Sequence, residues 1–173
     1  MDGGGGEKQT AIALNKTLIY IVSLLTKYQV TDWFLGYGTL LGIVRNKSCI
    51  KNDDDIDIII NRTYLPTLHR LAKENNFKIT LQKHIYFLRI EHTHYMPIDF
   101  YLAKSKDGIF IDTWENTRWT NVYPLIQQKW KGVTLQLPQH HLKNLKNRYG
   151  STWRTPKKSK GVRSKSMKKP VFI

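Results

Sequence analysis

A pair of glycines near residue 40 could form a binding site for phosphate. Gly38-Thr39 precedes an apolar segment, 40–45, that predicts a short helix and includes Gly42. Glycine lets a ligand approach the backbone closely, and the free amides at a helix N-terminus bind phosphate. The Thr39 hydroxyl adds a donor, and Arg45 could reach back toward the same phosphate unless it is simply exposed.

Acidic residues that could bind a divalent cation follow directly. Asp53, Asp55 and Asp57 alternate along an extended segment, so they share one face, while Asp54 and Ile56 point the other way. The chain has only thirteen acidic residues, and four of them lie within these five positions. An acidic surface loop is the simpler alternative. An isoleucine run follows at once, however, where unpaired charge is costly, so the pattern favours a Mg²⁺ or Mn²⁺ site of the phosphoryl-transfer type.

A third acid is expected from a neighbouring strand, either to complete the metal site or to accept a proton from a hydroxyl. Asp99 is the stronger candidate, because it stands alone within an apolar strand-like segment. Asp112 occupies a similar position in the next predicted strand and is the alternative.

Apolar periodicity around these motifs predicts a small α/β domain. Helices are expected over residues 8–28, 40–45, 64–74 and 139–149, and strands over 33–35, 55–60, 77–81, 85–91, 98–103, 109–113 and 133–137. The isoleucines at the end of segment 55–60 indicate a strand buried on both faces. The element order indicates a mixed β-sheet flanked by helices in a single compact domain.

The motifs resemble those of the LicD family, which includes bacterial phosphorylcholine transferases and fukutin-type ribitol-phosphate transferases. The resemblance is carried by segment 38–42, Arg45, Ile50, segment 53–58, Asp99, and looser C-terminal matches at 124–125, 130–132, 137–138 and 145–156. It covers about residues 30 to 156. Where the family often has Pro-Trp before the acids, this chain has Lys51-Asn52, so its fit to the donor can differ.

This resemblance implies a nucleotidyltransferase-like fold and a defined reaction. The reaction is metal-dependent transfer of a choline-, ribitol- or glycerol-phosphate from a CDP-linked donor to a glycan hydroxyl, with release of CMP. By the same resemblance, Asp55, Asp57 and Asp99 are the catalytic metal ligands, and Gly38, Thr39, Gly42 and Arg45 contact the donor.

The net charge of +15 leaves other functions open, because a strongly basic protein attracts polyanions. A nucleotidyltransferase acting on RNA or a small molecule is one alternative. A noncatalytic protein that binds nucleic acid or an anionic membrane is another. From residue 154 onward the chain has eight basic residues and no acid. We therefore expect a flexible leader at 1–7, a domain at 8–156 and a basic, disordered tail at 157–173.

Other residue types give weaker indications. Cys49 is the only cysteine, so neither an internal disulfide nor a disulfide-linked partner is expected. No signal peptide or membrane-spanning run is evident, which favours a cytoplasmic protein, either free or peripheral to a membrane. His92 and His94 could share a strand face as metal ligands, but exposed or hydrogen-bonded histidines are favoured. Four tryptophans, Trp114, Trp119, Trp130 and Trp153, are expected to be core residues rather than stacking platforms.

Overall fold

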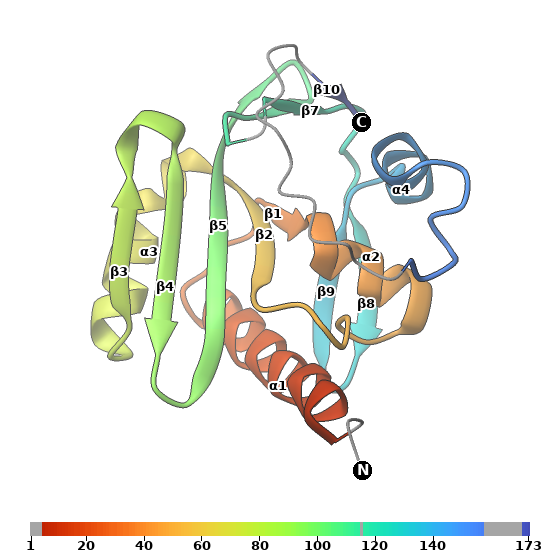
Figure 1. Cartoon of the computed structure of the whole chain (residues 1–173). Coiled ribbons are helices and arrows are strands. Elements are labelled where there is room, and N and C mark those ends of the chain that lie inside the picture. The colour runs from red at the N-terminus through yellow and green to blue at the C-terminus, as the bar shows by residue number, and fades with distance from the viewer. Residues whose placement is uncertain (1–4, 115, 158–170) are drawn as a thin grey trace.

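The computed structural model describes residues 5–114, 116–157 and 171–173, and Figure 1 shows how they are arranged. The helices in these residues are α1 (Gly5–Lys27), α2 (Tyr37–Asn46), α3 (Leu65–Glu74) and α4 (His141–Tyr149). The strands are β1 (Trp33–Leu35), β2 (Ile56–Asn61), β3 (Lys78–Gln82), β4 (Phe87–His92), β5 (Tyr95–Lys106), β6 (Ile109–Asp112), β7 (Thr117–Trp119), β8 (Ile126–Trp130), β9 (Val133–Leu137) and β10 (Val171–Phe172). Short 3₁₀ helices lie at Arg62–Tyr64 and Lys83–Ile85.

The long strand β5 organises the main sheet. Residues 98–103 of β5 pair in parallel with β2 on one side, and residues 95–101 pair antiparallel with β4 on the other. The last three residues, 104–106, pair with β6. Strand β1 extends the sheet beyond β2, β3 extends it beyond β4, and β7 and β10 extend it beyond β6. Strands β8 and β9 form a separate hairpin. This arrangement confirms the predicted mixed sheet flanked by helices (Figure 1).

Strand β2 is buried on both faces as predicted, and alternation along β2 and β5 places the acids on one of the two faces. Ile58 on β2 and Phe100 on β5 are fully buried, and they belong to one hydrophobic cluster with Leu14 and Leu18 of α1. The residue next to each of them along its strand, Asp57 on β2 and Asp99 on β5, points to the opposite face. Because a shift of one residue would exchange the two faces, this apolar packing holds the register that places Asp57 and Asp99 on the face opposite Ile58 and Phe100.

The first difference between the predicted and the observed elements concerns the start of α2. The sequence predicts a turn at Gly38-Thr39 followed by a helix over 40–45, whereas the helix begins at Tyr37. The carbonyl of Gly36 accepts the first helical hydrogen bond, from the Leu40 amide at 2.9 Å. Gly38 and Thr39 therefore lie in the first helical turn. Three strands, β7, β8 and β10, are not predicted, because they are very short or rich in polar residues.

The two predicted termini also differ from the structure. Helix α1 begins at Gly5, inside the predicted leader 1–7. Residues 158–170 of the predicted tail lie outside the described residues. The last three residues are part of the fold, because Ile173 is 2% exposed and its amide donates to the Arg118 carbonyl at 2.9 Å. Residues 171–173 of the predicted tail therefore pack against the domain. No described helix has both the length and the apolar character needed to span a bilayer.

Candidate active site

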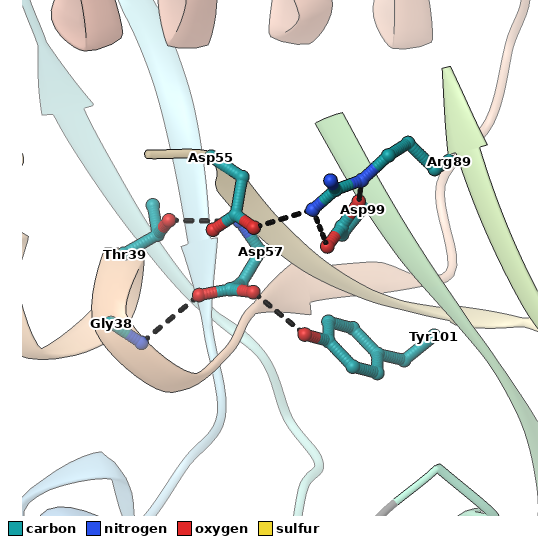
Figure 2. A network of polar contacts seen from close by, with 7 residues as sticks. All are labelled: Gly38, Thr39, Asp55, Asp57, Arg89, Asp99 and Tyr101. Carbon is teal, nitrogen blue, oxygen red and sulfur yellow. Dashed lines mark hydrogen bonds and ion pairs between the residues drawn. The ribbon is translucent and has the colours of Figure 1, made fainter. Parts of the chain in front are cut away.

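The first turn of α2 lies against the start of β2, and hydrogen bonds hold Asp57 there (Figure 2). The Gly38 amide donates to Asp57 Oδ2 at 3.1 Å, and the Asp57 amide donates to Thr39 Oγ1 at 2.9 Å. The Gly36 amide donates to the Asp57 carbonyl at 3.1 Å. The predicted glycine and acid motifs therefore meet. The Gly38 amide and Thr39 hydroxyl, predicted to contact phosphate, contact Asp57 in this structure.

Asp55, Asp57 and Asp99 together form what we call the acid cluster. One carboxylate oxygen from each residue lies within 4.8 Å of the others. The parallel pairing of β2 and β5 places Asp57 directly opposite Asp99, so their side chains share a face. Asp57 and Asp99 are 5% and 4% exposed. The structure thus brings together the three acids that the sequence nominates for metal binding.

Tyr101 is a member of this site that the sequence reasoning missed. Its hydroxyl donates to Asp57 Oδ1 at 2.8 Å (Figure 2). Burial and the nearby charges of Asp57 and Asp99 raise the Tyr101 pKa well above its ordinary value, so the hydroxyl remains a donor. Tyr101 lies two residues after Asp99 on β5, and strand alternation alone could have placed it on the acid face.

Arg89 is the second residue that the sequence reasoning missed, and it forms hydrogen bonds with two members of the acid cluster, Asp99 and Asp55. Its Nε and Nη2 atoms donate to the two oxygens of Asp99 at 2.6 and 2.8 Å. Nη2 also donates to Asp55 Oδ2 at 2.8 Å. Arg89 lies opposite Asp99 in the β4–β5 pairing. The sequence predicts that Arg89 lies on a strand. That Asp99 is its partner depends on the register between β4 and β5, which the sequence does not reveal.

The site carries more negative charge than Arg89 can balance. Burial, with lesser contributions from Asp99 and the other nearby carboxylates, raises the pKa of Asp55 to about 8. Burial and the charge of Asp55 raise the pKa of Asp57 well above its ordinary range. Hydrogen bonding to Asp99 raises the pKa of Arg89, so the guanidinium stays cationic. The ionised cluster therefore favours an additional cation.

The donor set fits a magnesium or manganese ion. Mg²⁺ prefers oxygen ligands, is held in proteins through a few carboxylates, and leaves its remaining positions to water or substrate phosphate. The cluster offers carboxylate oxygens from Asp55, Asp57 and Asp99 at mutually compatible distances. A second acidic grouping, Asp53 with Asp54 and Asp55, also satisfies this spacing, but Asp54 is exposed. The buried cluster, next to the N-terminus of α2, is the better-enclosed site.

These pKa shifts predict how the stability of the metal-free protein depends on pH. Burial raises the pKa of Asp53 to about 6, and the pKa of Asp55 is about 8. An acid whose folded pKa exceeds its unfolded value of roughly 4 binds protons more tightly when folded, so the folded state loses stability as pH rises between the two values. In EDTA, we expect the melting temperature to fall from about pH 5 to about pH 8.

Two further measurements test whether ionisation of the buried carboxylates causes the fall in melting temperature. Saturating Mg²⁺ should remove most of it, because the cation favours the ionised carboxylates. Asp55→Asn should flatten the EDTA profile. A wild-type melting temperature that rises through this pH range in EDTA would contradict the prediction.

The two glycines of α2 have different neighbours. A Cβ atom on Gly38 would lie 2.3 Å from Asp53 Oδ2, a side-chain atom beside the acid cluster. A Cβ atom on Gly42 would lie 2.6 Å from the Ser48 carbonyl oxygen and 3.0 Å from the Ile50 amide nitrogen. These are backbone atoms and cannot simply rotate away. Gly42 therefore allows close packing of α2 on the following loop, while the family resemblance implies that it contacts the donor.

Gly42→Ala is accordingly expected to destabilise the fold more than it affects chemistry. Overpacking typically lowers the free energy of unfolding by about 1–3 kcal/mol, and urea denaturation measures this change. Gly38→Ala is the matched comparison, because its added methyl disturbs Asp53 at the site and should reduce activity more than stability. The assignment of Gly42 to packing would be wrong if Gly42→Ala kept wild-type stability and lost activity.

Other predicted residues lie away from the acid cluster. Arg45 is in the last turn of α2, where Nη1 donates to the Trp153 carbonyl at 3.5 Å. Asp112 accepts hydrogen bonds from the Tyr37 hydroxyl and from the Trp114 amide. The candidate metal groupings among the described residues include neither Asp112 nor any histidine.

The histidine and tryptophan expectations can also be compared with the structure. His92 Nδ1 accepts a hydrogen bond from the His94 amide at 3.0 Å, which agrees with a hydrogen-bonded role. Trp119, Trp130 and Trp153 are buried as expected. Trp114 differs, because it is 41% exposed and stacks on Phe87 with ring centroids 4.5 Å apart.

Trp130 on β8 and Arg148 on α4 contact the two ends of α2. The Trp130 indole donates to the Lys47 carbonyl at the end of α2, at 2.8 Å. The Arg148 guanidinium lies 4.2 Å from the centre of the Tyr37 ring at the other end of the helix. Figure 1 shows α4 beside α2. Segments far apart in sequence thus hold the helix that contacts Asp57.

Two solved structures are similar to this chain in fold. The lincosamide antibiotic adenylyltransferase LnuA, bound to lincomycin, has a TM-score of 0.53 and 19% identity, over 75% of this chain and 83% of that chain. The antibiotic-resistance factor ANT(2'')-Ia has a TM-score of 0.57 and 11% identity, over 74% of this chain and 66% of that chain. At these identities the similarity establishes the nucleotidyltransferase-like fold. A search of curated protein sequences found no significant match.

The sequence itself matches a family described as "LicD/FKTN/FKRP, nucleotidyltransferase domain" over residues 31–156. The matched region begins before β1 and ends after α4, so it includes α2, the acid cluster, β8, β9 and α4. The family and the fold support a transferase that uses a nucleotide-linked donor. The protein therefore belongs to the LicD/FKTN/FKRP family of nucleotidyltransferase domains.

Proposed function

We propose that this protein transfers a phospho-alcohol, of the choline-, ribitol- or glycerol-phosphate type, from a CDP-linked donor to a glycan hydroxyl. The observation that carries the proposal is the acid cluster at the N-terminus of α2, within a domain that belongs to the LicD/FKTN/FKRP family. Asp55, Asp57 and Asp99 would hold Mg²⁺ or Mn²⁺. When bound, the cation would neutralise charge on the phosphate oxygens and help the leaving group depart.

The reaction would be an in-line displacement at phosphorus. The acceptor oxygen forms a bond to the phosphorus that carries the alcohol, and the bond from that phosphorus to the bridging diphosphate oxygen breaks. CMP leaves with the electron pair, and the hydroxyl proton passes to a carboxylate or to water. We place the donor diphosphate against the first turn of α2, where helix amides and the helix dipole favour anions.

The residues around Asp57 have a positioning role in this proposal. Gly38, Thr39 and Tyr101 hold both oxygens and the amide of Asp57 through hydrogen bonds of 2.8–3.1 Å. A carboxylate fixed from several sides loses less freedom when it binds a cation and substrate, which lowers the barrier through preorganisation.

A donor screen tests this function directly. Purified protein is incubated with CDP-choline, CDP-ribitol, CDP-glycerol or each common nucleoside triphosphate, with a glycan acceptor mixture, in Mg²⁺, Mn²⁺ or EDTA. Mononucleotide release measures turnover. We expect CMP from one CDP-linked donor in the metal arms and none in EDTA. CMP release that is unaffected by EDTA, or no release from any CDP-linked donor, would contradict the proposal.

The triphosphate arms test the alternative reaction, nucleotidyl transfer to a small molecule or RNA. The fold shared with two antibiotic-resistance proteins, one of them an adenylyltransferase, favours testing it. Pyrophosphate release from one triphosphate, with the nucleotide attached to an acceptor, would support that alternative. A noncatalytic binding protein would turn over none of these compounds.

A further inference from the structure

Arg89 holds the acid cluster in a way that conflicts with simple metal binding. Its guanidinium contacts both oxygens of Asp99 and one oxygen of Asp55, at 2.6–2.8 Å. Asp55 and Asp99 are two of the three candidate metal ligands. Figure 2 shows the guanidinium between these two carboxylates, with Asp57 bound separately by Gly38 and Tyr101. A cation is therefore already present at the cluster, and it is a side chain of the protein.

We infer that Arg89 takes the place of the divalent cation in the metal-free protein and, once displaced, binds the donor phosphate beside the metal. This inference rests on the proposed function, since it assigns a role at the same site. It makes Arg89 a substrate-binding residue rather than a permanent partner of Asp99.

The first step of the argument is charge. A guanidinium within hydrogen-bond distance of Asp55 and Asp99 would lie only a few ångströms from a metal bound to the same oxygens, and two cations repel strongly at that range. Arg89 also engages both oxygens of Asp99 and one oxygen of Asp55, which leaves fewer lone pairs for a metal. Both effects predict that Arg89 weakens metal binding as long as it stays in place.

The second step is mobility. The Arg89 side chain is 34% exposed, whereas the side chains of Asp55 and Asp99 are 15% and 5% exposed. It extends from β4 toward Asp99 on β5 and toward Asp55, which precedes β2. An incoming divalent cation would replace the charge that Arg89 supplies, so this long, partly exposed side chain can move aside while the buried carboxylates stay in place.

The third step is the ligand that Arg89 can bind after release. A guanidinium presents donors in a planar fork that matches two oxygens of a phosphate as well as it matches a carboxylate. A displaced Arg89 would remain anchored on β4 beside the cluster, where the donor diphosphate is proposed to lie. One arginine would thus neutralise the acids before substrate arrives and neutralise the phosphate afterwards.

Metal affinity separates this role from a purely structural one. Mn²⁺ binding to full-length protein is measured by electron paramagnetic resonance or calorimetry, without donor, for wild type, Arg89→Gln and Arg89→Lys. If Arg89 competes with the metal, Arg89→Gln should bind Mn²⁺ about tenfold or more tightly, with Arg89→Lys between it and wild type. Arg70→Gln, which removes an exposed arginine on α3, controls for the change in net charge.

Weaker or unchanged Mn²⁺ binding in Arg89→Gln would overturn the inference, because a residue that merely orients Asp99 should strengthen metal binding in the wild type. Thermal unfolding in EDTA and in Mn²⁺ shows whether each variant is folded. If Arg89→Gln unfolds without metal, Arg89→Lys carries the test, and affinity no tighter than wild type overturns the inference.

Steady-state kinetics test the second part of the inference, that the displaced Arg89 binds the donor phosphate. With the donor identified by the screen, we expect Arg89→Gln to raise the KM for that donor about tenfold and to change kcat less. An unchanged KM would overturn the assignment to phosphate binding. If wild type turns over no donor, the proposed function fails, yet the Mn²⁺ comparison still decides whether Arg89 competes with the metal.

Discussion

Replacing Asp57 by Asn is expected to lower kcat for metal-dependent CMP release about 10³-fold or more while leaving the protein folded. Asp57 is the acid held from most directions, by Gly38, Thr39 and Tyr101. Asparagine keeps the shape but removes the negative charge that a divalent cation requires. Mononucleotide release at saturating Mg²⁺ measures the loss.

The fold should tolerate this change because each contact of Asp57 can be kept. The asparagine oxygen can accept from the Gly38 amide while its amino group donates to the Tyr101 hydroxyl, which can also act as an acceptor. The substitution also removes one of several mutually repelling carboxylates. We therefore expect the melting temperature in EDTA to stay the same or rise.

Asp54→Asn is the matched control for this experiment. Asp54 lies in the same acidic run but is exposed and does not belong to the acid cluster. It should retain activity within a few-fold of wild type. If Asp54→Asn loses as much activity as Asp57→Asn, the metal is held by the exposed grouping of Asp53, Asp54 and Asp55 instead.

Asp99→Asn should produce the second large loss, about 10²–10³-fold in kcat, whereas Asp112→Asn should not. Asp99 is a member of the acid cluster and is opposite Asp57 in the sheet, while Asp112 bonds to Tyr37 and Trp114. Because Asp112 is buried and bonded, its replacement should lower stability by about 1–3 kcal/mol.

The two variants therefore separate chemical and structural roles. Activity at a temperature well below unfolding reports the chemical role, and urea denaturation reports the structural one. Full activity in Asp99→Asn together with inactive, folded Asp112→Asn would reverse the roles assigned to these two acids. The same measurements would then place the third acid on β6.

Much of the fold and part of the site are local properties of the chain. Leucines at helical spacing predict α1, and the β-branched run after Asp57 predicts a buried strand whose face follows from alternation. Asp99 could be selected because a lone carboxylate in an apolar strand needs a partner. Short or polar strands such as β7 and β8 were missed, because their pairing comes from neighbours rather than from their own residues.

Residue types and spacing were sufficient to nominate Asp55, Asp57 and Asp99 and to associate them with Gly38 and Thr39. They could not reveal that Arg89 and Tyr101 form hydrogen bonds with these acids, or that Gly42 lies close to the backbone of the following loop. The contacts of Arg89 and Tyr101 depend on which strands are neighbours and in what register. Strand β5 lies between β2 and β4 and pairs with both, and neither pairing can be read from the strands' own sequences. Side-chain direction along a strand is a local property, but the residue opposite is chosen by the packing of the whole sheet.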